Sequence, residues 1–461
     1  MSINTALLAG TSALRANATA MAVTSDNIAN ANTVGFKRQQ SDFTALLIQQ
    51  DNFSHYNAGG VLTSNRAMVS EQGALEASNL STHMAVSGDG MFVTRRKAAD
   101  ATASDGYFFT RAGQFQPDSE GYLVNTSGYY LHGWPIDENN PIPTGPTDLD
   151  VLEPVRISNI GGAAEATSSL SFSANLQASQ EVNPAAATYD LTANPGVSMA
   201  SGDFPPDFQS TIQMYDSLGG IRTLAVSFLK SATNANEWFA EIHAVPASDM
   251  QGTGRPDGLV ASGTVAFTPF GQLDTANTTL PTTIDILASD AVATDPQVGW
   301  AAGSGLAAQT ISLDIGGAIT PGGLTQYDTP SELNESAVNG RAYGVLSSVE
   351  VDQDGFVNAL FSNGLSRAIY QLPLATFANV SGLNQAQGGA YTASPEAGQL
   401  NMKAANEGGA GIVQSRALEA STVDLAKEFT DLIVTQRAYS ASSKIVTTAD
   451  EMLDELIRIK R

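Results

Sequence analysis

Apolar residues near the C-terminal end of the chain recur every seven residues. No glycine or proline interrupts residues 421–461, so the pattern predicts one long helix with a coiled-coil seam. The seam consists of Leu418, Leu425, Leu432, Tyr439, Val446 and Leu453. A second seam is half polar and consists of Thr422, Phe429, Gln436, Ser443, Asp450 and Ile457. The stretch from Ser421 to Asp424 fits a capping box at the start of this helix.

The first thirty residues repeat this spacing. Leu7, Leu14, Met21 and Ile28 lie seven residues apart, and the helix that they predict ends near residues 30–35, where Asn and Gly tolerate left-handed backbone. A seam of this kind contributes on the order of 10 kcal/mol, but ordering some forty residues costs several times as much. Each helix could pack on its own domain. Two such helices at opposite ends of one chain favour an antiparallel pair formed by the termini.

Between the two predicted helices the chain has a β-type pattern. Short apolar runs alternate with Gly, Asn and Pro from residue 73 onward, and Val345–Asp352 and Phe356–Phe361 flank a hairpin turn at Asp354-Gly355. We therefore predict an α+β multidomain fold, with long terminal helices paired as a coiled coil and two nested, mainly-β domains inserted between them. The predicted parts are a terminal helical assembly domain (1–35 and 415–461), a connector (36–72 and 400–414), a discontinuous inner β domain (73–155 and 324–399) and an outer β domain (156–323).

Composition narrows the possible classes of function. The net charge of −24 argues against nucleic acid as a partner, because phosphate binding needs clustered basic residues. The acidic residues are concentrated in the middle, since residues 1–40 sum to +2 and residues 415–461 to −1. The absence of cysteine excludes disulfides and thiolate chemistry. No apolar run has the length of a membrane span, and the N-terminus lacks the pattern of a cleaved signal peptide.

Catalytic motifs are also missing from the sequence. It contains no P-loop, no His-Glu-x-x-His metal motif and no Gly-x-Ser-x-Gly nucleophile elbow. The four histidines are dispersed, and Asp352–Gly355 lacks the later ligands of a calcium loop. Acidic residues could supply a glycosidase pair, but nothing singles out two of them. We predict a structural or interaction protein with no catalytic residue, no metal site and no cofactor.

Four blocks of the sequence together resemble the bacterial flagellar rod and hook protein family. The β-domain blocks are Gly88–Phe92 and Thr110–Phe115, and Gln213–Gly219 is similar to the outer domain of the hook branch. Two positions depart from the family pattern, Thr422 in place of Asn and Val380 in place of Pro. The terminal blocks that carry the resemblance contain Asn27, Asn30, Asn32, Gly35, Phe36, Lys37, Ser421, Asp424, Gln436 and Arg437.

The resemblance implies a self-assembling subunit of the flagellar hook, a curved helical tube that acts as a flexible universal joint and transmits motor torque from rod to filament. It implies export through the type III apparatus without a cleaved signal peptide, and an extracellular location in the hook and basal body. The implied partners are further copies of the chain and the rod, hook-cap and hook–filament junction proteins. On this view the apolar heptad residues of both helices form the assembly interface.

Two alternatives to a hook subunit remain at this point. One is another axial subunit of the flagellum, either from the distal rod or from the hook–filament junction. The other, of a different class, is an extracellular β-rich carbohydrate-active enzyme or adhesin with helical ends.

Overall fold

The computed structural model describes residues 3–46, 59–98, 105–136, 149–158, 160–190, 198–252, 256–294, 297–317 and 322–459. These residues form two compact units. Unit 1 comprises residues 1–160, 348–360 and 366–461, and unit 2 comprises residues 161–347 and 361–365. The fold is mostly β, with one helix near each end of the chain.

The two long helices are α1 (Ile3–Ala29) and α2 (Leu425–Ile459). Asp424 caps α2, because its Oδ1 accepts hydrogen bonds from the backbone N–H groups of Ala426 (2.9 Å) and Lys427 (3.3 Å). The predicted capping box at Ser421 is therefore wrong, and α2 begins four residues later. Leu418 does not extend the helical series, since it lies in strand β32 (Ala417–Glu419).

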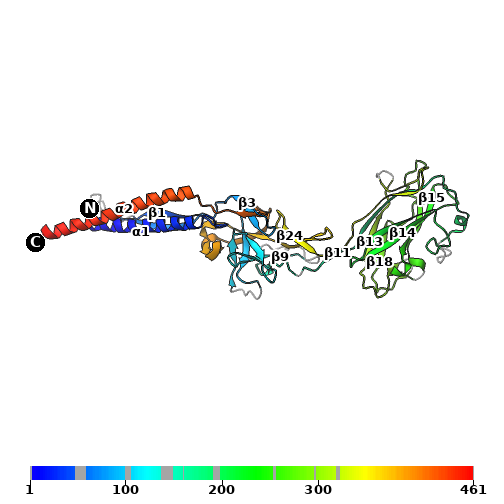
Figure 1. The fold of residues 1–461 in the computed structure, drawn as a ribbon, viewed down its shortest axis with the longest axis horizontal. Coiled ribbons are helices and arrows are strands. Elements are labelled where there is room, and N and C mark those ends of the chain that lie inside the picture. Colours follow the sequence, from blue (N-terminus) through cyan, green and yellow to red (C-terminus); the bar gives the residue numbers. More distant parts are fainter. Residues whose placement is uncertain are drawn as a thin grey trace. The chain divides into compact units, whose positions relative to one another are not determined.

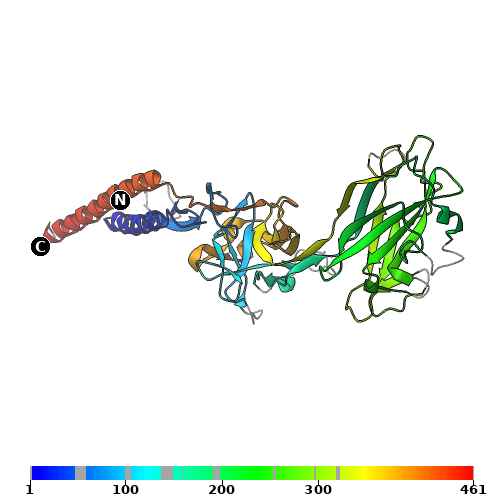
Figure 2. The same ribbon diagram turned by 45° about the vertical axis from the view of Figure 1, so that its right-hand side comes forward.

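Helices α1 and α2 contact each other and run antiparallel, with both chain ends at the same end of the pair (Figures 1 and 2). Gly10 of α1 allows a close approach, because a Cβ at this position would lie 2.8 Å from Cγ2 of Val446. At the other end of the pair, Asn27 donates a hydrogen bond of 3.1 Å to the carboxylate of Glu428.

The predicted connector is not an unpaired extended segment where the structure describes it. Strands β1 (Gln39–Ala45) and β2 (Val61–Ala67) form an antiparallel hairpin that contacts α1. Residues 47–58 lie outside the described ranges. On the C-terminal side, β30 (Leu400–Ala404) pairs with β27 (Pro373–Phe377), and β31 (Ile412–Ser415) pairs with β4 (Met84–Ser87). This part of the chain therefore belongs to the β-structure of unit 1.

The main sheet of unit 1 combines strands from both halves of the chain. Its path is β24-β25-β26-β9-β5-β6-β29-β28, and its core contains Met91, Phe109, Trp134 and Tyr391. The predicted hairpin at residues 345–361 is confirmed as β24 and β25. The bounds of the strands of this sheet, and of β3 and β4 in the two small sheets beside it, are β3 (Leu75–Ala77), β4 (Met84–Ser87), β5 (Met91–Arg95), β6 (Phe108–Thr110), β7 (Phe115–Pro117), β8 (Leu123–Asn125), β9 (Tyr130–Pro135), β10 (Glu153–Pro154), β24 (Leu346–Val351), β25 (Phe356–Phe361), β26 (Ser366–Gln371), β27 (Pro373–Phe377), β28 (Asn384–Ala386) and β29 (Ala390–Thr392).

Unit 2 contains two larger sheets that share one buried core, and a small sheet of β11 and β23. One sheet has the order β13-β14-β15-β17, and the other β16-β19-β18-β20-β12-β21 with β22 alongside β12. Phe172, Trp238 and Trp300 are among the largest side chains of the common core. The strands are β11 (Ala163–Glu165), β12 (Ser169–Asn175), β13 (Phe208–Tyr215), β14 (Ile221–Lys230), β15 (Glu237–Val245), β16 (Met250–Gln251), β17 (Leu259–Ala266), β18 (Thr283–Leu287), β19 (Val298–Trp300), β20 (Gln309–Asp314), β21 (Leu324–Thr325), β22 (Glu332–Val338) and β23 (Arg341–Gly344).

The predicted return of the chain to the inner domain at residue 324 is too early. Strands β21 and β22 pair with β12, and β23 pairs with β11, so residues 324–344 complete sheets of unit 2. The chain re-enters unit 1 at Ser348. The error has a simple cause, because a strand that completes a distant sheet has the same local sequence pattern as one that begins a new sheet.

Candidate assembly surface

The most deeply buried positions of the helix pair carry small or polar side chains. On α1 they include Ala16, Ala20 and Thr24. On α2 they include Ser442 and Ala449, which are seven residues apart. Small residues let two helix backbones approach closely, and these positions form a buried stripe beside the predicted large apolar seam.

The predicted heptad residues divide into two groups by exposure. A half-buried group flanks the small-residue stripe and consists of Leu7, Leu14, Met21, Ile28, Leu432, Val446 and Leu453. An exposed group consists of Leu425, Phe429, Tyr439 and Ile457. Within the half-polar seam, Gln436 and Asp450 are exposed as well.

Helix α2 exposes further large apolar residues that the seven-residue series missed. They are Ile433, Val434, Ile445, Met452 and Ile459. Three of them, Ile445, Met452 and Ile459, are again seven residues apart, so a search for a second register would have found them. The described part of the chain leaves these side chains of α2 exposed. Exposed apolar area of this extent typically marks an interaction surface.

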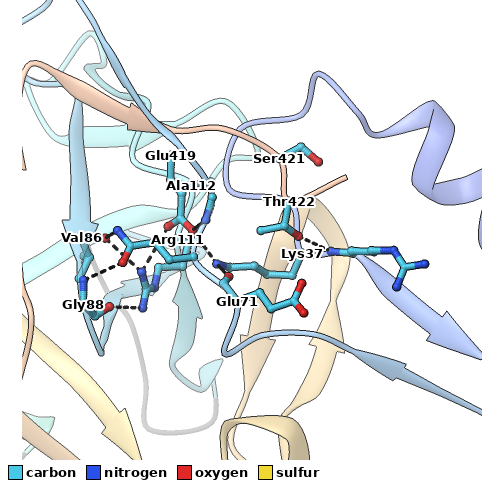
Figure 3. A network of polar contacts seen from close by, with 12 residues as sticks. Lys37, Glu71, Val86, Gly88, Arg111, Ala112, Glu419, Ser421 and Thr422 are labelled. Atoms are coloured by element: carbon cyan, nitrogen blue, oxygen red, sulfur yellow. Dashed lines mark hydrogen bonds and ion pairs between the residues drawn. The ribbon is translucent and has the colours of Figure 1, made fainter. Parts of the chain in front are cut away.

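A buried charge network fixes the C-terminal segment to the β-structure of unit 1 beside the helices. The carboxylate of Glu419 lies 2.6 Å from Nζ of Lys37 and 3.3 Å from the guanidinium of Arg111 (Figure 3). It also accepts a hydrogen bond of 2.8 Å from the backbone N–H of Gly73. All three charged side chains are buried. Burial lowers the pKa of Lys37, and the neighbouring carboxylate of Glu419 opposes this shift.

A second network ties the end of α1 to the start of α2. Glu428 is almost fully buried and accepts from Nε of Arg38 at 2.5 Å and from the amide of Asn27 at 3.1 Å. Asn27 also exchanges two hydrogen bonds of 2.8 Å with the backbone of Gln39. The backbone N–H of Arg38 donates to Oγ1 of Thr422 at 2.8 Å, so Thr422 fixes the approach to α2 and does not cap it.

The signature residues have different structural roles. Gly35 has a φ of +70°, and a Cβ on it would lie 2.7 Å from the backbone nitrogen of Ala112, so this position requires glycine. Phe36 is buried. Asn30 bonds back to the Asp26 carbonyl within α1. Asn32, Gln436 and Arg437 are exposed. The residues that carry the family resemblance therefore lie in two places. Some lie where the helices connect to the β-structure of unit 1, and others lie on the exposed side of α2.

Two further features limit the chemistry of the described residues. Among them no group of three or more His, Asp or Glu side chains is placed to hold a metal ion. No helix in these ranges is long and apolar enough to cross a membrane.

Family models match the chain in four places. Residues 7–37 match the flagella basal body rod protein family, and residues 85–166 match the flagellar hook protein FlgE/F/G D1 domain. Residues 205–341 match the flagellar basal body protein FlaE D2 domain. Residues 414–459 match the C-terminal family of the flagellar basal body rod FlgEFG proteins.

Individual proteins are similar to the chain over its whole length. The flagellar hook protein FlgE of Caulobacter vibrioides is 35% identical, and that of Brucella suis biovar 1 is 31% identical, with 100% of both chains covered in each case. The crystal structure of Helicobacter pylori flagellar hook protein FlgE2 is 15% identical, covers 75% of this chain and 100% of that one, and has a TM-score of 0.44. From the full-length sequence matches and the family models we conclude that this chain belongs to the flagellar hook protein family, which is structural and not enzymatic.

Proposed function

We propose that this chain polymerises through its terminal helices into a curved helical tube, the flagellar hook, which works as a flexible universal joint between rod and filament. The observation that carries the proposal is the row of large apolar side chains that α2 leaves exposed. Leaving such a row in water is unfavourable, and burying each side chain would contribute about 1.5–3 kcal/mol. In the proposed tube, neighbouring copies of the chain cover this row of side chains.

Within one subunit, α1 and α2 pair as an antiparallel coiled coil in this proposal. The half-buried residues, among them Leu14, Met21 and Val446, flank the contact between the two helices. The exposed residues, among them Phe429 and Ile457, contact neighbouring subunits. Leu418 is no longer part of the helical interface, because it lies in β32.

The proposed partners and location follow from the family. They are the rod, the hook cap and the hook–filament junction proteins, with delivery through the type III export apparatus to an extracellular position. The terminal helices and the β-structure of unit 1 form the inner wall, and unit 2 forms weaker outer contacts that slide when the tube bends. The concentration of acidic residues in the middle of the chain supports an outer, solvated position for unit 2.

The test replaces Phe429 and Ile457 by serine in the full chain and measures the concentration above which it polymerises. These side chains are 51% and 63% exposed in the single chain. Their loss therefore removes contacts between subunits and changes the fold of the subunit little. Burial of the exposed half of each is worth about 1 kcal/mol, so we expect the critical concentration to rise at least about tenfold.

The matched control is Phe270→Ser in unit 2, which removes an aromatic ring that is 82% exposed. We expect this variant to polymerise at nearly the wild-type concentration, with tubes visible by electron microscopy. A Phe429→Ser/Ile457→Ser variant that polymerised as readily as the wild type would refute assembly through this face of α2.

A further inference from the structure

Charge is distributed unevenly along the helix pair. From Leu432 to Ala449 α2 carries Arg437 and Lys444 and no acidic residue. The part of α1 before Asp26 carries Arg15 and no acidic residue. We call these three cations the basic band. The next stretch of α2 carries four acidic residues and no basic one, and we call it the acidic tip: Asp450, Glu451, Asp454 and Glu455.

Arg437 and Lys444 of the basic band share one face of α2 with most of the acidic tip. Arg437, Lys444 and Glu451 follow one another at seven-residue spacing, which keeps them on one side of a helix with a drift of only about 20° per heptad. Asp454 and Glu455 lie three and four residues further on and therefore flank Glu451. All seven residues of the basic band and the acidic tip are exposed.

These charges are almost unpaired in the part of the chain that the structure describes. Among the described residues the only ion pair that involves either group joins Glu455 to Arg458, at 4.0 Å. The basic band has no acidic partner there. Acidic and basic residues separated along one helix cannot meet within that helix, so a complementary partner for either group has to come from another molecule.

An apolar hollow lies where the basic band gives way to the acidic tip. It has a volume of about 340 Å³ and is lined by Ala6, Lys444, Ile445, Thr448, Ala449 and Met452. Beyond the acidic residues, Ile457 and Ile459 are exposed at the end of α2. The basic band thus places Lys444 beside an apolar hollow, and the acidic tip places its carboxylates beside the exposed side chains of Ile457 and Ile459.

We infer that the acidic tip of one copy docks on the basic band of a second copy, head to tail. This inference rests on the proposed self-assembly and specifies which surfaces meet. The centres of the two charged groups are about twelve residues apart on α2, so copies in parallel would be offset by about 18 Å along the helix axis. A contact between two different patches leaves one of each free at the ends, and such a contact grows into an open helical polymer.

The inference is tested by two charge-reversed forms of the full chain. The first carries Arg437→Glu and Lys444→Glu, which makes both patches acidic. The second carries Glu451→Lys, Asp454→Lys and Glu455→Lys, which leaves Asp450 as the single acid of the tip and makes both patches basic. Each form alone brings like charges together, and we expect its critical concentration for polymerisation to rise about tenfold or more. The defect should shrink as salt screens the repulsion.

The decisive sample is an equal mixture of the two forms. In the mixture every acidic patch can meet a basic patch on the other form, so we expect co-polymers near the wild-type concentration. The control is Glu332→Lys/Glu335→Lys, which raises the net charge by four on the exposed strand β22 of unit 2; it should polymerise normally. Normal assembly of either reversed form alone, failure of the mixture, or a closed dimer as the product would overturn the inference. The wild-type chain in the same assay reports separately on the proposed function.

Discussion

Replacing Glu419 by glutamine tests the buried charge network most directly. The substitution keeps the shape of the side chain and removes its charge, which leaves Lys37 and Arg111 buried without their anion. Removing one partner of a buried ion pair costs about 3–5 kcal/mol. The side chain of Glu419 is fully buried, so solvent does not reduce this cost.

The assay is urea unfolding of the monomer at low concentration, followed by ellipticity at 222 nm. Both long helices lie in unit 1, so this signal reports that unit. Two of the three tryptophans, Trp238 and Trp300, lie in unit 2, and their fluorescence provides an internal reference. With a urea dependence of about 1–3 kcal/mol/M, the unfolding midpoint of unit 1 should fall by about 1 M or more.

The matched control is Glu76→Gln, since Glu76 is an exposed glutamate on the strand that pairs with β32. Its effect should stay within about 0.5 kcal/mol. In addition, Lys37→Met combined with Glu419→Gln should cost less than the sum of the two single changes, because the pair is lost together. Equal midpoints for Glu419→Gln and Glu76→Gln, or strict additivity in the double variant, would show that the network does not stabilise unit 1.

Two further predictions concern particular residues of unit 1. Burial lowers the pKa of His132 to about 4, below its ordinary value of 6.5. Between these two pH values the unfolded chain binds a proton at His132 that the folded chain does not bind. The free energy of unfolding of unit 1 should therefore fall by about 3 kcal/mol as the pH falls from 6.5 towards 4. Urea unfolding at pH 7 and pH 4.5 should show this loss in the wild type and a smaller one in His132→Asn. Gly35→Ala should destabilise unit 1 and leave unit 2 unchanged, because Cβ would enter the backbone of Ala112 at a φ of +70°; differential scanning calorimetry that showed no change in either transition would contradict this explanation.

Local patterns predicted those elements whose contacts are near in sequence. The seven-residue series gave both long helices, and the turn at Asp354-Gly355 gave the β24–β25 hairpin. The start of α2 could not be predicted in this way. The segment before α2 pairs with β3, and Glu419 binds Lys37, which is 382 residues away in the sequence. These distant contacts hold residues 417–419 in a strand, so the helix begins only at Leu425.

The packing of α1 against α2 has a feature that the heptad series does not identify. A heptad series identifies the seam by its large apolar residues, but the buried positions of the two helices include Ala16, Ala20 and Ser442, and Gly10 faces Val446. Pairing through small residues holds the backbones close and turns part of the large residues outward. In the proposed function this division has a consequence: the small residues suffice to pair the helices within a subunit, and Phe429 and Ile457 remain available to bind its neighbours.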